Sequence, residues 1–150
     1  MTEVLHVVAV VLTGLSAGLF ATFSYVVMPG LRRADDATFV QTMRSINVAI
    51  LNPVFAVVFG GAAVALVAAL VATWSMDARP WLIVALLLYV AGAFVVTGAV
   101  NIPLNDALAS GAGAPAPLRQ SFEARWVLFN HVRAVLTVAA FASATIGLVV

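Results

Sequence analysis

The 150-residue sequence contains no cysteine and no lysine, and only 9% of its residues are charged. The absence of cysteine excludes disulfides, thiolate zinc sites, cysteine-ligated iron–sulfur clusters and a cysteine nucleophile. Seven scattered arginines against six acidic residues give a net charge of +1, so no basic stripe is available to follow a phosphate backbone. Soluble domains carry about 25% charged residues. The composition therefore excludes both an ordinary soluble domain and a nucleic-acid-binding protein.

Long apolar runs take the place of the missing charges. Apolar residues make up 64% of the chain, and the mean hydropathy is +1.14. Charge-free runs at 4–31, 45–76 and 80–105 each exceed the roughly 20 residues that a helix needs to span a bilayer. A fourth run reaches that length if it begins near Trp126 and carries Arg133 with it. We therefore predict an all-α fold, an integral membrane four-helix bundle.

Proline and asparagine positions give the expected helix boundaries. Pro29-Gly30 is expected to end the first helix, because this pair cannot continue a helix cheaply. In the first loop, apolar residues recur at helical spacing after Asp35 and Asp36, which predicts a capped amphipathic helix at the membrane surface. Asn52-Pro53 fits an N-cap followed by proline at the first helical position. The single domain, residues 1–150, has transmembrane helices predicted at about 4–28, 53–75, 80–102 and 126–150, and the interfacial helix at about 36–51.

Arginine is unevenly distributed between the two ends of the predicted bundle. The first and third loops, together with the start of the last helix, contain six of the seven arginines, and the opposite side contains only Arg79. The third loop is predicted at 107–117 from its content of Ala, Gly, Pro and Ser. By the positive-inside rule, the two long loops are cytoplasmic and both termini lie outside. The chain is thus predicted to be a multi-pass integral membrane protein.

Polar side chains gather at the cytoplasmic end of this predicted bundle. An unpaired amide or charge in hydrocarbon is costly, so their concentration predicts a shared, hydrogen-bonded pocket. The residues concerned are Asn47, Asn52, Asn101, Asn105, Asn130, His131 and Arg133.

The last helix carries one polar stripe. At about 100° per residue, Trp126, Asn130, Arg133 and Thr137 fall within about 60° of one another, and we expect them to face the bundle interior. His131 lies nearly opposite Arg133, so both side chains cannot point into the centre of one narrow site.

Purely structural interpretations remain open for these residues. Arg133 lies close enough to the interface to snorkel, or it pairs with Asp106 or Glu123. His131 is then a hydrogen-bonded interfacial histidine. The asparagines then serve as links between helices and as caps.

The two histidines raise the question of haem. His6 precedes Pro29 by 23 residues, about 34 Å of helix at ~1.5 Å per residue, and His131 lies toward the Pro29 side. One haem cannot bridge that distance within a monomer. Haem ligated by His131 alone is the remaining alternative. Because the helix cores lack acidic side chains, a carboxylate-ligated metal is not expected, and we predict neither a metal nor an organic cofactor.

Several of these segments resemble the anthrone oxygenase family of small four-helix membrane proteins. The matching pieces occur in order along nearly the whole chain. They include Asn52-Pro53, the TGAVNIPLN segment from Thr97 to Asn105, and the WVLFNHVR segment from Trp126 to Arg133. The Asn-x-Pro-x-Asn and Asn-His-x-Arg pieces are the specific part of the resemblance.

The resemblance implies a membrane-bound oxygenase. Named members of that family oxidise anthrones, which are hydrophobic aromatic polyketide intermediates, with O2 and without an organic cofactor or metal. Such chemistry needs a base, groups that stabilise an enolate, and a dry aromatic pocket. On this hypothesis the catalytic residues are His131 as the base with Arg133 and Asn130. The substrate-binding residues are Asn101, Asn105, Asn47 and Trp126.

A base at His131 would have to reach the same cavity as Arg133.

Two other function classes remain open: a non-catalytic accessory membrane protein, and a small transporter. A proton-coupled exporter of this size needs a membrane-embedded carboxylate, and the first three predicted helices contain none between their ends. The expected partners are the lipid bilayer, a small aromatic molecule and, in a homo-oligomer, further copies of the chain.

Overall fold

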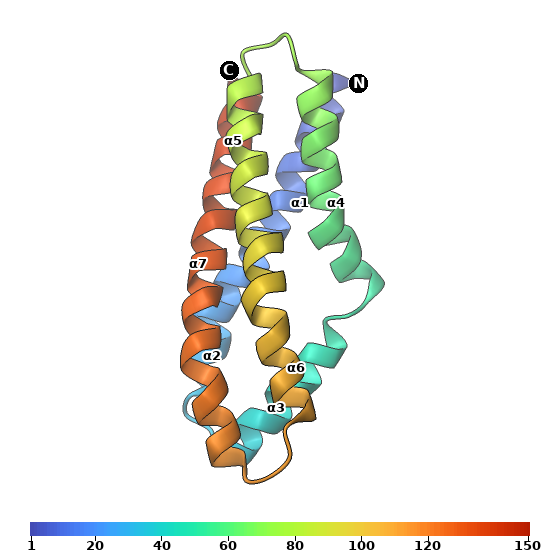
Figure 1. Cartoon of the computed structure of the whole chain (residues 1–150). Coiled ribbons are helices and arrows are strands. Elements are labelled where there is room, and N and C mark those ends of the chain that lie inside the picture. Colours follow the sequence, from blue (N-terminus) through green and yellow to red (C-terminus); the bar gives the residue numbers. More distant parts are fainter.

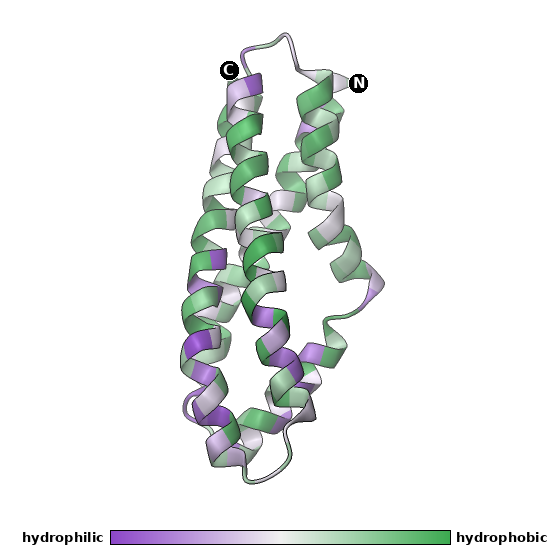
Figure 2. Ribbon diagram, viewed as in Figure 1, coloured by the Kyte–Doolittle hydropathy of each residue, from purple (hydrophilic) through white to green (hydrophobic).

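The computed structural model describes all 150 residues as helices and short connections. Four long apolar helical runs, long enough to cross a membrane, form an elongated antiparallel bundle with both termini at one end (Figure 1). Apolar residues dominate along the runs, and polar residues gather toward the opposite end (Figure 2). The predicted all-α bundle with four apolar helices is thus confirmed, and the chain is a multi-pass membrane protein. The runs are Thr2–Leu31, Pro53–Ala72, Arg79–Ser110 and Pro115–Val149.

The first and third runs continue through the prolines that were expected to end them. The first consists of α1 (Thr2–Thr22), the π-helix η1 (Phe23–Val27) and α2 (Met28–Leu31). The expected stop at Pro29-Gly30 is therefore wrong. Proline has no N–H to donate to the carbonyl four residues back, and its ring crowds that carbonyl. The wider π-turn before Pro29 relieves the crowding, so the helix continues without this hydrogen bond.

The third run repeats this arrangement. It consists of α5 (Arg79–Tyr89), the π-helix η2 (Val90–Asn101) and α6 (Ile102–Ser110). Here too the π-helix ends directly before an X-Pro step, Ile102-Pro103, and the helix continues beyond the predicted boundary at 102.

The caps of the two middle helices agree with the sequence. The interfacial helix α3 (Asp36–Ala49) begins after Asp35, whose side chain accepts from the Thr38 N–H at 2.9 Å. Hydrogen bonds from Thr38 hold the pKa of the Asp35 carboxyl below its ordinary value. α4 (Pro53–Ala72) begins after Asn52, whose side chain accepts from the Phe55 N–H at 3.0 Å. Both predicted N-caps are confirmed.

The last helix begins earlier than predicted. α7 (Pro115–Val149) starts inside the segment 107–117 that was expected to be a loop. Prolines are tolerated in the first turn of a helix, because the N–H groups there have no intrahelical partner. Residues near the start of α7 can therefore pack against α3 below the membrane-spanning part.

α3 lies across the end of the bundle opposite the termini (Figure 1). Its buried residues Phe39, Val40 and Met43 pack in one apolar cluster with Phe122 and Trp126 of α7. This layer closes the bundle beneath the polar residues of α7.

Arg119 fastens this closing layer to the first loop. Its guanidinium donates to the carbonyls of Arg32 and Ala34 at 3.0 and 2.9 Å, and it pairs with Glu123 at 2.7 Å and Asp36 at 3.1 Å. It also lies 4.5 Å from the centroid of the Phe39 ring. One side chain thus joins α7, α3 and the loop before α3.

Arg119→Met is expected to loosen this attachment. The loss of several charge-assisted hydrogen bonds should lower the free energy of local opening by about 1 kcal/mol and speed cleavage of the first loop by proteinase K. Arg33→Met is the matched control, because Arg33 is exposed and its side chain makes no hydrogen bond. Equal cleavage rates in the two variants would contradict the proposed fastening.

Candidate functional site

Arg133 is buried in the membrane-spanning part of α7. It is only 7% exposed, and its guanidinium donates to the Asn130 Oδ1 at 2.6 Å and to the Thr97 Oγ1 of η2 at 3.2 Å. The guanidinium carbon lies 4.1 Å from the centroid of the Phe20 ring. No carboxylate pairs with it, since the ion pairs of the chain involve Arg32 and Arg119. Neither the snorkelling arginine nor the pair with Asp106 or Glu123 is found.

Asn130 joins α7 to the first helical run. Its side chain is fully buried, and its Nδ2 donates to the Ser24 Oγ of η1 at 2.8 Å and to the Phe20 carbonyl at 3.2 Å. Its Oδ1 accepts from Arg133, as described above. We call the four hydrogen-bonded residues Arg133, Asn130, Thr97 and Ser24 the Arg133 cluster.

The two π-helices supply the hydroxyls of the Arg133 cluster. Ser24 lies in η1 and Thr97 in η2, and π-turns inside α-helices are frequent at functional sites. The part played by Ser24 was not foreseen from the sequence. The available signal was a hydroxyl shortly before the X-Pro step at Pro29.

Asn101 brings an unused amide to this region. Its side chain is 1% exposed, and neither its Nδ2 nor its Oδ1 has a hydrogen-bond partner. It lies at the end of η2, four residues after Thr97. The Arg133 Nε and the Asn47 Nδ2 of α3 are also buried without partners. Leaving such an atom unpaired costs about 1–3 kcal/mol, so these groups offer unmet hydrogen-bonding capacity to a ligand.

Trp126 and Asn105 form a separate pair below the Arg133 cluster. The Trp126 Nε1 donates to the Asn105 Oδ1 at 2.9 Å, and its ring lies 5.7 Å from the Arg133 guanidinium carbon. Asn105 is therefore already engaged. The inward orientation predicted for the polar stripe of α7 is confirmed, because Trp126, Asn130, Arg133 and Thr137 are all buried.

His131 is not brought together with Arg133. It is exposed on the outer surface of α7, and its Nδ1 lies 2.7 Å from the Val127 carbonyl of the same helix. The condition for a base at His131, a side chain that reaches the same site as Arg133, is not met in this arrangement. His131 has the placement of the hydrogen-bonded interfacial histidine considered above.

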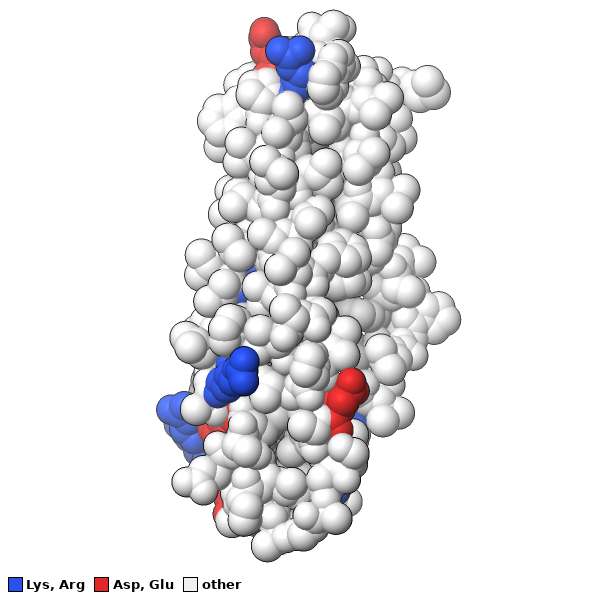
Figure 3. Space-filling model, viewed as in Figure 1, with Lys and Arg blue, Asp and Glu red and all other residues white.

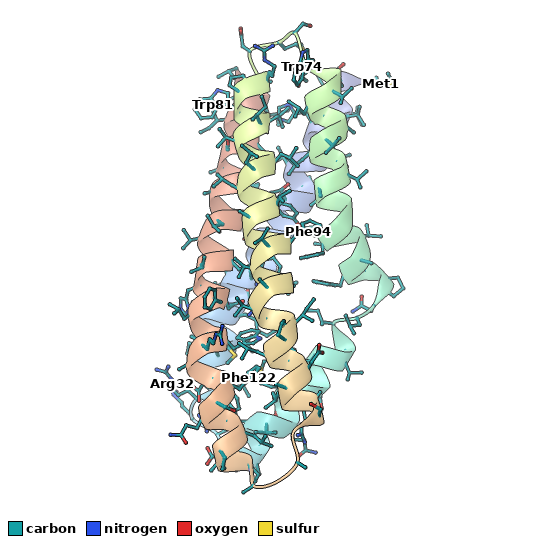
Figure 4. All side chains as sticks on the ribbon, in the orientation of Figure 1. Met1, Arg32, Trp74, Trp81, Phe94 and Phe122 are labelled. Atoms are coloured by element: carbon teal, nitrogen blue, oxygen red, sulfur yellow. The ribbon has the colours of Figure 1, made fainter.

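Aromatic rings continue from the Arg133 cluster toward α4. The Phe20 ring contacts Phe59 edge-to-face at a centroid distance of 6.3 Å, and Phe59 lies 4.7 Å from Phe94 and 5.0 Å from Phe55. Figure 4 shows Phe94 on the side of the third run that faces α4. The site therefore combines a cation, an unused amide and an aromatic lining.

A comparison with known families adds to this geometry. The anthrone oxygenase family profile matches residues 49–143, more than half of the chain. The chain belongs to the anthrone oxygenase family. No curated protein and no solved structure matches it. In this anthrone oxygenase family member, the matched segment contains Asn101, Asn130 and Arg133, whereas Phe20 and Ser24 lie outside it.

The acidic and histidine side chains of this family member are dispersed. No three of its Asp, Glu and His residues come close enough together to hold a metal ion. His6, which was considered for haem, lies at the end with the termini, where its Nε2 is 2.9 Å from the Ala144 carbonyl. The expectation of no metal and no organic cofactor stays a prediction.

Proposed function

We propose that the protein is a membrane-bound oxygenase that oxidises an activated, acidic C–H position of an anthrone-like aromatic molecule with O2, without an organic cofactor. The observation that carries the proposal is the buried Arg133, which has no carboxylate partner and lies among aromatic rings. A buried positive charge without a counter-ion favours an anionic ligand. Membership of the anthrone oxygenase family supports this chemistry.

The proposed reaction proceeds through an enolate. Loss of a proton from the ring CH2 group places negative charge on the carbonyl oxygen, which Arg133 and the Asn101 Nδ2 stabilise. The electron-rich carbon then transfers electrons to O2 and bonds to it, giving a hydroperoxide that loses water to leave the new C=O. In total, the CH2 group and O2 give C=O and H2O, with four electrons passing from carbon to oxygen.

Proton removal in this proposal depends on electrostatics. No histidine or carboxylate is hydrogen-bonded to the Arg133 cluster, so in this proposal the buried cation acts by lowering the pKa of the bound carbon acid. A single water molecule held beside the ligand accepts the proton and returns it to the peroxide oxygen. Fixed donors in a dry site stabilise a developing oxyanion by about 3–4 kcal/mol. Asn130 and Thr97 hold the guanidinium in place.

His131→Ala is expected to leave turnover nearly unchanged, within about threefold, because a general base normally contributes about 10²–10⁴-fold and this ring faces outward. The measurement is the rate of anthrone-dependent O2 uptake by the variant in lipid nanodiscs. A loss of a hundredfold or more would return the role of base to His131.

The proposed function is tested with the purified protein in nanodiscs. After anthrone is added, an oxygen electrode follows O2 uptake and chromatography quantifies anthraquinone. We expect one O2 consumed per anthraquinone formed, at a rate well above that of empty nanodiscs. Uptake no faster than in empty nanodiscs would contradict the oxygenase.

We further propose the orientation given by the arginines. The end closed by α3 carries most of the charged side chains, and a nearly uncharged belt separates it from the other end (Figure 3). Arg79 is the first residue of α5 and lies at the end with the termini. The α3 end is cytoplasmic in this proposal, and both termini lie outside.

A further inference from the structure

Arg133 is closed off from both aqueous sides of the bundle. Toward the termini, the bundle is filled by a tight apolar core of small and large side chains, among them Leu66, Leu82 and Tyr89, each fully buried. Toward the opposite end, α3 and the buried Phe39, Met43 and Trp126 close the bundle. A ligand that reaches Arg133 along the bundle axis would have to disrupt one of these two layers.

The α3 layer is also fastened at two points. Arg119 holds the first loop against α7, as described above. Arg44 of α3 donates to the carbonyls of Leu108 and Gly111 at 2.9 and 2.7 Å, which ties α3 to the end of the third run. These bonds oppose opening of the bundle toward that side.

The side of the bundle between α4 and η2 is built differently. There the row of rings described above begins at the surface, with Phe94 38% exposed and Phe55 and Phe59 partly exposed, and it ends at Phe20 beneath the Arg133 guanidinium. Figure 4 shows Phe94 at this boundary, about midway along the bundle. A Cβ added at Gly60 of α4 or at Gly98 of η2 would meet nothing within 4 Å.

We propose that a planar aromatic ligand reaches the Arg133 cluster laterally from the bilayer, between α4 and η2, with Phe94 and Phe59 as the gating side chains. The tilted and edge-to-face ring contacts at 4.7 and 6.3 Å can be replaced by contacts with an incoming aromatic molecule at little cost in free energy. This inference rests on the proposed function for the identity of the ligand. The path itself is a property of the fold.

Tyr89 acts as a positioning residue for this gate. Its hydroxyl lies 2.9 Å from the Phe59 carbonyl of α4 and 2.9 Å from the Ser16 Oγ of α1. The tyrosine donates to the carbonyl and accepts from the serine, and so anchors α4 at the level of Phe59. The part of α4 before Phe59 has no comparable side-chain link to the third run.

The test uses a thiol whose labelling requires no turnover. Because the chain has no cysteine, Asn101→Cys in nanodiscs provides a single buried thiol in the candidate site. It is labelled with N-(1-pyrenyl)maleimide, which partitions into the bilayer, and with a charged methanethiosulfonate, which stays in water. Each rate is normalised to that of a thiol that the same reagent reaches freely. The reference is Val95→Cys on the lipid-facing surface for the pyrene reagent, and Ala112→Cys in the third loop for the charged reagent.

We expect the normalised rate of the pyrene reagent to exceed that of the charged reagent by about tenfold. Adding Phe94→Ala should raise the pyrene rate by about threefold, and adding Gly98→Trp should lower it by about threefold, since gating side chains control access. Leu87→Ala, exposed two turns away on α5, is the matched control and should change neither rate. Val95→Cys in each background corrects for altered membrane partitioning.

Two results would overturn lateral access. One is faster normalised labelling by the charged reagent, with the pyrene rate insensitive to Phe94→Ala and Gly98→Trp. The other is no labelling by either reagent, because the path must admit a molecule of several fused rings. A protein without oxygenase activity would still give the labelling pattern, so failure of the proposed function and failure of the access path are distinguishable.

Discussion

Arg133→Met lowers kcat/KM for anthrone oxidation by about 10²–10³-fold, the effect expected when a fixed oxyanion-stabilising donor is removed from a dry site. Methionine keeps much of the volume and the unbranched stem, but it removes the charge that faces the ligand. In the wild type the Asn130 Oδ1 and the Thr97 hydroxyl accept hydrogen bonds from the guanidinium. The substitution leaves both without this donor. The measurement is the dependence of O2 uptake on anthrone concentration in nanodiscs.

Two further variants separate the charge from its geometry. Arg133→Lys keeps the positive charge but loses the planar fork, so it should recover part of the lost rate. Arg125→Met, at an exposed position on the same helix without a side-chain hydrogen bond, controls for the loss of one arginine near the α3 end of the bundle. Full activity in Arg133→Met, with thermal unfolding like that of Arg125→Met, would contradict the proposed role.

Gly92→Ala destabilises the bundle by about 1–3 kcal/mol, the usual cost of forcing extra atoms into a packed interface. A Cβ at Gly92 would lie 2.7 Å from the Leu136 Cβ and 3.4 Å from the Arg133 carbonyl of α7. The nearest atom is a Cβ, not the end of a flexible side chain, so η2 and α7 must move apart. Thermal unfolding in detergent measures the effect.

Gly98→Ala is the matched control in the same π-helix. A Cβ there would meet nothing within 4 Å, so the variant should unfold like the wild type or slightly later. Moving η2 away from α7 also separates Thr97 from Arg133, so Gly92→Ala should lose activity below its unfolding temperature. Equal stability of the two variants would show that η2 and α7 are not in close contact at Gly92.

Much of the fold follows from hydrophobic run length and capping chemistry. Runs without charge predict four spans because the bilayer fixes the length of a helix. The cap at Asp35 and the Asn52-Pro53 start of α4 were predicted from local hydrogen-bonding preferences. The buried stripe with Asn130 and Arg133 was predicted because a helix repeats its faces every 3.6 residues.

The π-helices could not be predicted in this way. Proline before a polar segment predicts a helix end from local chemistry, but packing against neighbouring helices carries the chain through Pro29 and Pro103 in a widened turn. That widening changes which side chains face inward, and so the contact between Ser24 and Asn130 was missed. The sequence alone predicted that His131 and Arg133 lie on nearly opposite faces of the last helix, and the structure shows the same arrangement.

The most direct test of the Arg133 cluster is the absorption spectrum of anthrone bound to the protein in nanodiscs without O2. If the buried cation stabilises the enolate, anthrone should bind as its anion near neutral pH, with a red-shifted band that rises with protein concentration and is lost in Arg133→Met. A bound anthrone that remains neutral, or an equal anion band in Arg133→Met, would contradict enolate stabilisation by Arg133.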